Sequence, residues 1–343
     1  MSAAAAPVEG ARARRLTERI FRIRELGIIV AFLALVTVTG ILEPRFVETA
    51  SLRNLALNAS IFAILAIGQT LVLVTRNVDL SVGSVLGLSA YLAGDLLSKH
   101  PGSWLPLVFV AGMALGAACG LLNGVLVTWG RVPALVVTLG TLYAFRGLAF
   151  LWTNGTQINA ETLPDAFLNL GTDSIVGIPI LVIIALVVLV VVGFLLREYR
   201  AGRELYAIGS NPDGARLAGV RSDRRVLLAF VGAGALAGLG GVLFTARFGT
   251  VDATAGTGYE LTVIAAAVVG GVAIFGGVGS VYGAALGALL LGTITSSLIV
   301  LKVAAFWQQA AIGALLLLAI ALDRLVAVRV EAALRRRSAR RAG

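Results

Sequence analysis

The sequence predicts an all-α, polytopic helical membrane protein with about 10 transmembrane helices, and three observations lead to this prediction. The mean hydropathy is +0.94, only 13% of the 343 residues are charged, and apolar stretches of about 20 residues recur along the chain. Length alone would allow two soluble domains, but so apolar a composition does not fit them. The 41 glycines agree with the prediction, because small residues let transmembrane helices approach closely.

Ten apolar stretches define candidate spans and divide the chain into three parts. Residues 1–25 form a basic N-terminal tail, residues 26–322 the transmembrane domain, and residues 323–343 a basic C-terminal tail. We expect one or more broken or re-entrant segments in the transmembrane domain. The candidate spans lie near 26–42, 55–75, 80–97, 104–128, 132–152, 175–196, 226–246, 260–276, 279–300 and 303–322, and of these 80–97 and 132–152 are candidates for re-entry.

The lysine and arginine residues predict how these spans are oriented. If the N-terminus lies in the cytoplasm, 22 of the 28 fall in inside segments and five in outside segments, while Arg146 falls within a span. Cytoplasmic segments of membrane proteins carry such an excess, so we expect both termini in the cytoplasm. This distribution explains the net charge of +10 without nucleic acid as a partner.

Only two connections between the spans are long. The connection at 153–174 has no Lys or Arg and is expected outside, whereas the connection at 197–225 has seven arginines and is expected inside. In the inside connection, Pro212 suits the first turn of a helix and Gly219 suits a C-cap. The pattern predicts a short amphipathic helix that forms a rigid contact surface for a cytoplasmic partner. The alternative is a loop whose positive charge serves only to orient the protein.

Several kinds of catalytic chemistry are excluded by residue counts. With only two lysines, Lys99 and Lys302, the chain contains no GxxxxGK[ST] phosphate-binding loop. Its single histidine, His100, and single cysteine, Cys119, argue against a zinc site, a Ser-His-Asp triad or an intrachain disulfide. We therefore expect neither an enzyme nor a bound metal or cofactor.

Two polar features interrupt the apolar pattern. The stretch "LVTRNVDLSVGS" at 73–84 predicts a broken helix in which Arg76 and Asp79 pair, and Asp79 or Ser81 caps a helix beginning near Val82. The alternative is an ordinary cytoplasmic turn with a capping aspartate. Arg146, in "LYAFRGLAFLW", is either a snorkelling or structurally paired side chain or a polar group on a transport path.

One further pattern concerns packing alone. In "GMALGAACGLLNG", glycines recur every four residues, at Gly112, Gly116, Gly120 and Gly124. This spacing places them along one helix face and predicts a close contact with another helix.

The sequence resembles the membrane permease subunit of bacterial carbohydrate ABC importers of the ribose/xylose type, and within that family the subgroup that imports autoinducer or rhamnose. The resemblance covers about residues 50–323. It rests on "LAIGQTLVLVTRNVDLSVGS", "NGVLVTWGRVPALVVTLGTLYAFRGLAFLWTNG", "GRELYAIGSNPDGARLAGV" and "VIAAAVVGGVAIFGGVGSVYGAALGALLLG".

The resemblance implies a location in the bacterial inner membrane, among its lipids, and three kinds of protein partner. These are a separate ABC ATPase subunit, an extracytoplasmic sugar-binding protein and a second permease, identical or related. A separate ATPase would explain the missing phosphate-binding loop. The residues that match the family's ATPase-coupling segment are Gly202, Arg203, Asn211, Pro212, Ala215, Arg216 and Gly219.

A sugar path should present amides and hydroxyls rather than strong fixed charge, because sugars are neutral and carry many hydroxyl groups. On this basis we expect Gln69, Asn77, Ser84, Asn123, Thr138 and Thr141 on the path, together with Arg76, Asp79, Ser81 and Arg146 from the interrupted stretches. The competing function is an ion-coupled secondary transporter or channel for a small polar solute. Against it stand the organised basic connection and the lack of a relay of buried carboxylates.

Overall fold

The structure is a computed structural model that describes residues 26–304, 306–315, 317–318 and 321. It is built from helices, with one short antiparallel hairpin of strands β1 (Ser174–Ile175) and β2 (Ile178–Pro179). Both predicted terminal tails lie outside the described residues. The first described helix is Leu26–Leu42, followed by η1 Pro44–Val47, α2 Thr49–Leu73, α3 Val82–Lys99, α4 Leu105–Thr128, α5 Ala134–Thr153, η2 Ala160–Thr162, α6 Asp165–Thr172, α7 Ile180–Glu198, α8 Arg200–Ser210, α9 Pro212–Leu217, α10 Ser222–Phe248, α11 Tyr259–Val269 and α12 Val281–Val300.

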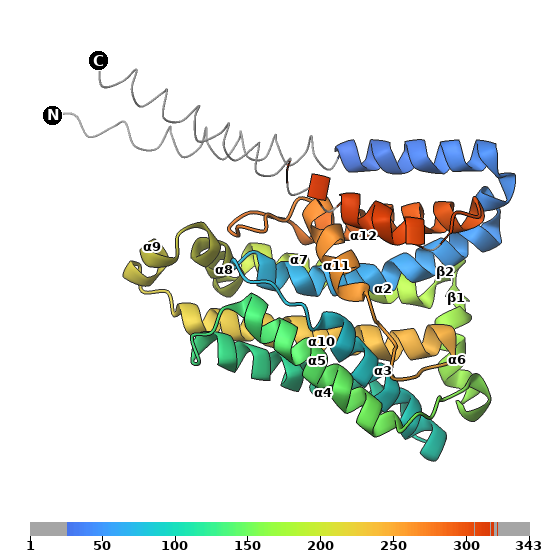
Figure 1. The fold of residues 1–343 in the computed structure, drawn as a ribbon, viewed down its shortest axis with the longest axis horizontal. Helices are drawn as coiled ribbons and strands as arrows, with labels where there is room; N and C mark the ends of the chain where they lie inside the picture. Colours follow the sequence, from blue (N-terminus) through green and yellow to red (C-terminus); the bar gives the residue numbers. More distant parts are fainter. Residues whose placement is uncertain (1–25, 305, 316, 319–320, 322–343) are drawn as a thin grey trace.

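Six of the described helices are long and apolar enough to cross a membrane, namely α2, α4, α5, α7, α10 and α12. Helix Leu26–Leu42 and α11 are apolar but shorter. The prediction of an all-α membrane protein is therefore confirmed, whereas the count of about 10 spans and the cytoplasmic termini stay predictions. Of the six, α2 and α10 are the most buried, so they form the centre of the bundle (Figure 1).

The glycine repeat on α4 forms the contact that its spacing predicts. A Cβ at Gly116 would collide with the backbone of Gly234 and Gly238 on α10, and one at Gly120 would collide with the backbone of Phe230. The glycines of α10 face α4 in return, because a Cβ at Gly234 would collide with the carbonyl group of Gly116. The two backbones thus touch along several turns, with no room for side chains between them.

Breaks between apolar helices interrupt the bundle. Segments 80–97 and 132–152, our candidates for re-entry, form the continuous helices α3 and α5, and their re-entry stays a prediction. A break does separate α2 from α3, at 74–81, as the polar stretch predicts. The apolar stretch 260–276 is helical only over Tyr259–Val269, and non-helical segments precede and follow it.

The segment that precedes α11 runs along α3 as a series of turns. It begins at an isolated bridge between Ile158 and Val251, and then passes Gly87 and Gly83, where any Cβ would collide with the carbonyl groups of Ala255 and Gly256. Gly256 (φ +73°) and Gly258 (φ +83°) then turn the chain into α11. Residues 251–258 therefore fill a groove that the glycines of α3 leave open.

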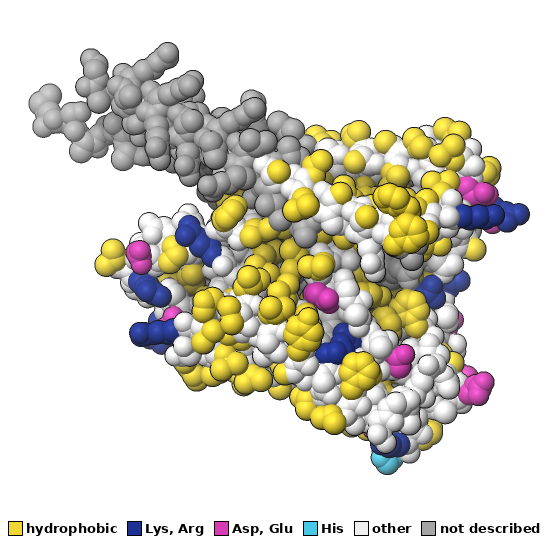
Figure 2. Space-filling model, in the orientation of Figure 1, with side chains coloured by type: hydrophobic (Ala, Val, Ile, Leu, Met, Phe, Trp, Pro, Cys, Tyr) yellow, Lys and Arg dark blue, Asp and Glu magenta, His cyan; other side chains and the backbone are white. Residues whose placement is uncertain are grey.

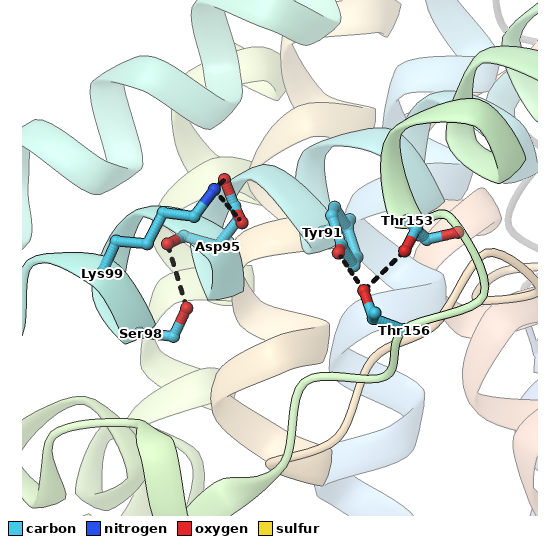
Figure 3. A network of polar contacts seen from close by, with 6 residues as sticks. All are labelled: Tyr91, Asp95, Ser98, Lys99, Thr153 and Thr156. Carbon is cyan, nitrogen blue, oxygen red and sulfur yellow. Dashed lines mark hydrogen bonds and ion pairs between the residues drawn. The ribbon is translucent and has the colours of Figure 1, made fainter.

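The described part of the molecule has two distinct ends. Helices α8 and α9 lie at one end, and α6 with the β1–β2 hairpin at the other (Figure 1). The end of α3 nearer α6 is held by its own polar network, in which the Tyr91 hydroxyl bonds to Thr156 Oγ1 over 3.0 Å and Lys99 pairs with Asp95 over 2.8 Å (Figure 3). The Tyr91–Thr156 bond joins the chain that leaves α5 to α3, while the Lys99–Asp95 pair lies within α3.

Candidate functional site

The polar stretch after α2 is held by the end of α8 rather than by an internal ion pair. The Arg76 backbone is left-handed (φ +68°), and its guanidinium donates from Nε to the carbonyl oxygen of Gly209 and from Nη2 to that of Ser210 over 2.9 Å. The last carbonyls of a helix have no partner within it and lie at the negative end of its dipole, so they attract a cation. The predicted Arg76–Asp79 pair is therefore wrong, because Arg76 bonds to α8 instead.

Asp79 begins α3 in a different way from the predicted cap. Its Oδ1 accepts hydrogen bonds from the Ser81 backbone N–H over 2.8 Å and from the Ser81 hydroxyl over 2.7 Å. Both donors belong to the residue just before the helix, and neither Asp79 nor Ser81 accepts a bond from the first N–H groups of α3. The capping prediction is thus wrong, and Asp79 instead forms a turn that aims the chain into α3.

Helices α4 and α5 hold this turn from the side. The Asn123 Nδ2 group of α4 donates to the Ser81 hydroxyl over 2.8 Å, and the Thr138 hydroxyl of α5 lies 3.2 Å from the carbonyl oxygen of Val78. The Asn123 Oδ1 atom is buried and has no hydrogen-bond partner. Three helices and the 74–81 break therefore share one buried polar cluster.

Most residues predicted for the sugar path are buried in this structure. Arg76 is exposed, and Asn77 and Arg146 are partly exposed. Both polar atoms of the Gln69 side chain lack partners, a costly arrangement for a buried amide. A path role stays a prediction for all ten residues. The buried ones are Gln69, Asp79, Ser81, Ser84, Asn123, Thr138 and Thr141.

Arg146 is paired with backbone. Its Nη1 donates to the carbonyl oxygens of Ala253 and Ala255, each over 2.7 Å. It thereby fastens segment 251–258 to the middle of α5. A structurally paired side chain was one of the two interpretations of Arg146 that the sequence allowed.

The basic connection between α7 and α10 forms two helices, of which the second was predicted. Asn211 caps α9, with its Oδ1 accepting from the Gly214 N–H over 3.0 Å. Pro212 occupies the first turn, and Gly219 ends the motif with φ +79°. The short helix between two spans is therefore confirmed, with α8 preceding it.

The seven predicted coupling residues differ in their burial and in their contacts. Gly202 lies against the backbone of Leu195 and Leu196, where no side chain would fit, and Ala215 is buried. Arg203 donates to the carbonyl oxygen of Glu198 over 2.7 Å. On α9, Arg216 is exposed.

Two further residues of this region were not identified from the sequence. Leu217, beside Arg216, is 90% exposed, unusual for a large apolar side chain. Glu204 is buried and pairs through Oε1 with Arg200 over 2.7 Å and through Oε2 with Arg225 of α10. The hydrogen bond from Arg225 contributes most to holding the pKa of Glu204 below its usual range, and Arg200 adds to it. The spacing of Arg200 and Glu204 was visible in the sequence, but the partner on α10 was not.

Helix α8 also contacts both non-helical segments at its end of the bundle. A Cβ at Gly209 would collide with the carbonyl oxygen of Val74. The Gly277 N–H donates to that same oxygen over 2.9 Å, and the Tyr206 hydroxyl donates to Gly279 over 3.1 Å. Segments 74–81 and 270–280 are therefore joined to each other and to α8.

Comparisons with known proteins agree on the kind of protein. A family model described as "Branched-chain amino acid transport system / permease component" matches residues 51–320. The Autoinducer 2 import system permease protein LsrC of Escherichia coli O157:H7 is 38% identical over 313 residues, which are 91% of this chain and 90% of that protein. The protein of the same name from Salmonella choleraesuis (strain SC-B67) is 40% identical over 294 residues, which are 86% of this chain and 84% of that one. No solved structure matches.

Proposed function

Because the chain belongs to the permease-component family of the branched-chain amino acid transport systems, we propose that it is the membrane-spanning subunit of an ATP-driven importer for a small sugar-like solute. As a multi-pass protein of the bacterial inner membrane, it requires an ATPase subunit, an extracytoplasmic binding protein and a second permease as partners. The substrate class follows from the relatives, whose names state that they import autoinducer 2. The chain itself contains no phosphate-binding loop for ATP.

The observation that carries the proposal is the connection of α8 and α9 to the rest of the bundle. A loop that served only to orient the protein would need neither the buried Glu204 pairs nor the Arg76 bonds to Gly209 and Ser210. A segment that receives force from an ATPase needs both a rigid body and an exposed contact face. Arg216 and Leu217 supply that face, and the other predicted coupling residues shape and hold the two helices behind it.

The connections also offer a route for the coupling. A movement of α8 acts directly on segments 74–81 and 270–280, which it contacts through Gly209, Tyr206 and the partners of Arg76. Segment 74–81 in turn carries Asp79 and Ser81 at the start of α3. We propose that the buried polar cluster holds this break in one of two arrangements, and that its amides and hydroxyls meet the solute when the arrangement changes.

The test is to purify the full chain from its native membrane in mild detergent and identify its companions. We expect a nucleotide-binding subunit with phosphate-binding loops, and uptake that requires ATP. Recovery of the chain alone, with uptake that persists without ATP and stops when the proton gradient is removed, would contradict the proposal. It would favour the ion-coupled carrier instead.

A further inference from the structure

A second polar surface lies outside the coupling region and outside the buried cluster. Its charged side chains are Arg146 in the middle of α5, Asp252 in segment 251–258 and Glu260 at the start of α11, and all three are partly exposed. The carboxylates of Glu260 and Asp252 interact electrostatically with the Arg146 guanidinium. Charged side chains appear among hydrophobic ones on the face over α3 and α11 (Figure 2).

The glycines of α3 make room for these side chains. A Cβ at Gly83 would collide with Glu260 Oε2, and one at Gly87 would lie 3.1 Å from Arg146 Nη1. Gly83 belongs to the first turn of α3, whose N–H groups favour a nearby carboxylate. Glu260 Oε1 also accepts from the Gly258 N–H over 3.2 Å. The position of Glu260 is thus fixed by α3 and by its own turn, while part of its side chain stays accessible.

Aromatic rings border the same surface. The ring of Tyr259, the residue before Glu260, has its centroid 4.6 Å from that of Phe62 and 6.1 Å from that of Phe244. Phe244 in turn lies 4.5 Å from Phe248. Phe62, Phe244 and Tyr259 are partly exposed and Phe248 is 44% exposed, so part of each ring can contact a ligand.

The charged side chains on this surface argue against contact with lipid. Charged side chains at membrane depth are expensive in hydrocarbon and face protein or water-filled cavities instead. The alternative, a purely structural ion pair, would not need open aromatic faces beside it. Aromatic faces combined with a few fixed polar groups are the usual lining of a small-molecule site.

We propose that Tyr259, Phe62, Glu260 and Arg146 form a subsite for a neutral, polyhydroxylated solute on the wall of the transport path. The rings pack against the apolar face of the solute, and the carboxylate and guanidinium bind its hydroxyl groups. This inference rests on the proposed function and adds to it the surface that meets the substrate.

The first experiment tests whether the wall meets water, and it needs no substrate. Thr262 lies one turn after Tyr259, on the same side of α11, and is partly exposed. In a Cys119→Ser background, Thr262→Cys is treated in cells with a membrane-impermeant thiol reagent, with Val190→Cys on α7 as the control, since Val190 is 60% exposed on an apolar span. We expect the cysteine at 262 to react and the one at 190 to stay unmodified. Equal lack of reaction at both positions would overturn the inference.

The second experiment tests recognition, with labelled autoinducer 2 and ribose as probes. We expect Tyr259→Leu and Glu260→Gln to lower uptake at least fivefold and to change the ratio between the two probes, while Val190→Ala on α7 retains uptake and the ATPase subunit is recovered as in wild type. A structural role alone would lower uptake of both probes in proportion. If wild-type uptake depends on ATP but the variants do not change the ratio between the two probes, the inference is wrong and the proposed function is still supported. Wild-type uptake without ATP sinks the proposed function itself.

Discussion

At the scale of single residues, side chains in this protein find partners that are far away in the sequence. Arg76 bonds to residues 209 and 210, and Asn123 bonds to Ser81. Sequence reasoning placed both in polar surroundings but paired Arg76 with Asp79, three residues away. Local spacing predicts local partners, and it carries no information on which distant carbonyl oxygens a fold brings near.

Arg76 should be necessary for coupling rather than for folding. We expect Arg76→Gln to lower ATP-dependent uptake strongly, because it removes charged hydrogen bonds worth about 1.5–3 kcal/mol from the contact with α8. Uptake assays at equal amounts of membrane-inserted protein measure this. Arg131→Gln, the same change at an exposed arginine in the connection between α4 and α5, is the control. An Arg76→Gln variant that transports as well as this control would contradict the prediction.

Glu204 should make stability depend on pH in a definite direction. Its carboxyl has a pKa of about 4.3 when unfolded and a lower pKa when folded, so its pairs with Arg225 and Arg200 stabilise the protein at neutral pH. That contribution is lost as the pH falls through the folded pKa. The melting temperature of wild type should exceed that of Glu204→Gln at pH 7, and the difference should shrink below about pH 4. A difference that stays constant with pH would mean that the carboxylate charge is not responsible.

At the scale of elements, the apolar pattern predicted where most helices lie but not where they break. The stretches 104–128 and 132–152 agree closely with α4 and α5, because long apolar runs leave helices as the main option in a membrane. The stretch 260–276 misled, since only its first part is helical, in α11, although the whole stretch is apolar. Two glycines that follow α11, Gly271 (φ +101°) and Gly276 (φ +78°), were the sign of a break.

The contact between α4 and α10 should tolerate no added atoms. Gly116→Ala places a methyl group into the backbone of α10, so we expect a lower melting temperature of the detergent-solubilised protein. Gly147→Ala on the neighbouring α5 is the matched control, because nothing lies within 4 Å of its Cβ position. Removing a helical glycine there should leave stability unchanged or raise it by about 0.5–1 kcal/mol. Equal effects at both positions would refute the packing argument.

At the scale of the whole molecule, the connection 197–225 shows which features can be predicted from the sequence and which cannot. Its arginine count predicts that the connection lies in the cytoplasm, and its short helix followed from Pro212 and Gly219, which act locally. Its attachment to segments 74–81 and 270–280 did not, because that attachment depends on how three distant parts of the chain meet. The arrangement of the candidate path residues could not be predicted from the sequence. Residue type indicates polarity but not which face of a helix stays open.

The two ends of the molecule each present one almost fully exposed apolar side chain, and this allows a test of which end meets the ATPase. Leu217 on α9 is 90% exposed, and Val176 at the tip of the β1–β2 hairpin is 96% exposed (Figure 1 shows the two elements at opposite ends). A large apolar residue beside Arg216 fits the centre of a protein interface, where truncation or charge costs most. We expect Leu217→Asp to reduce recovery of the ATPase subunit at least tenfold on co-purification, with the chain still inserted in the membrane. Val176→Asp, an equal change in polarity at the far end, should leave recovery unaltered. If the two variants behave alike, or if Val176→Asp alone releases the subunit, then α9 is not the contact that transmits the energy of ATP hydrolysis to the bundle.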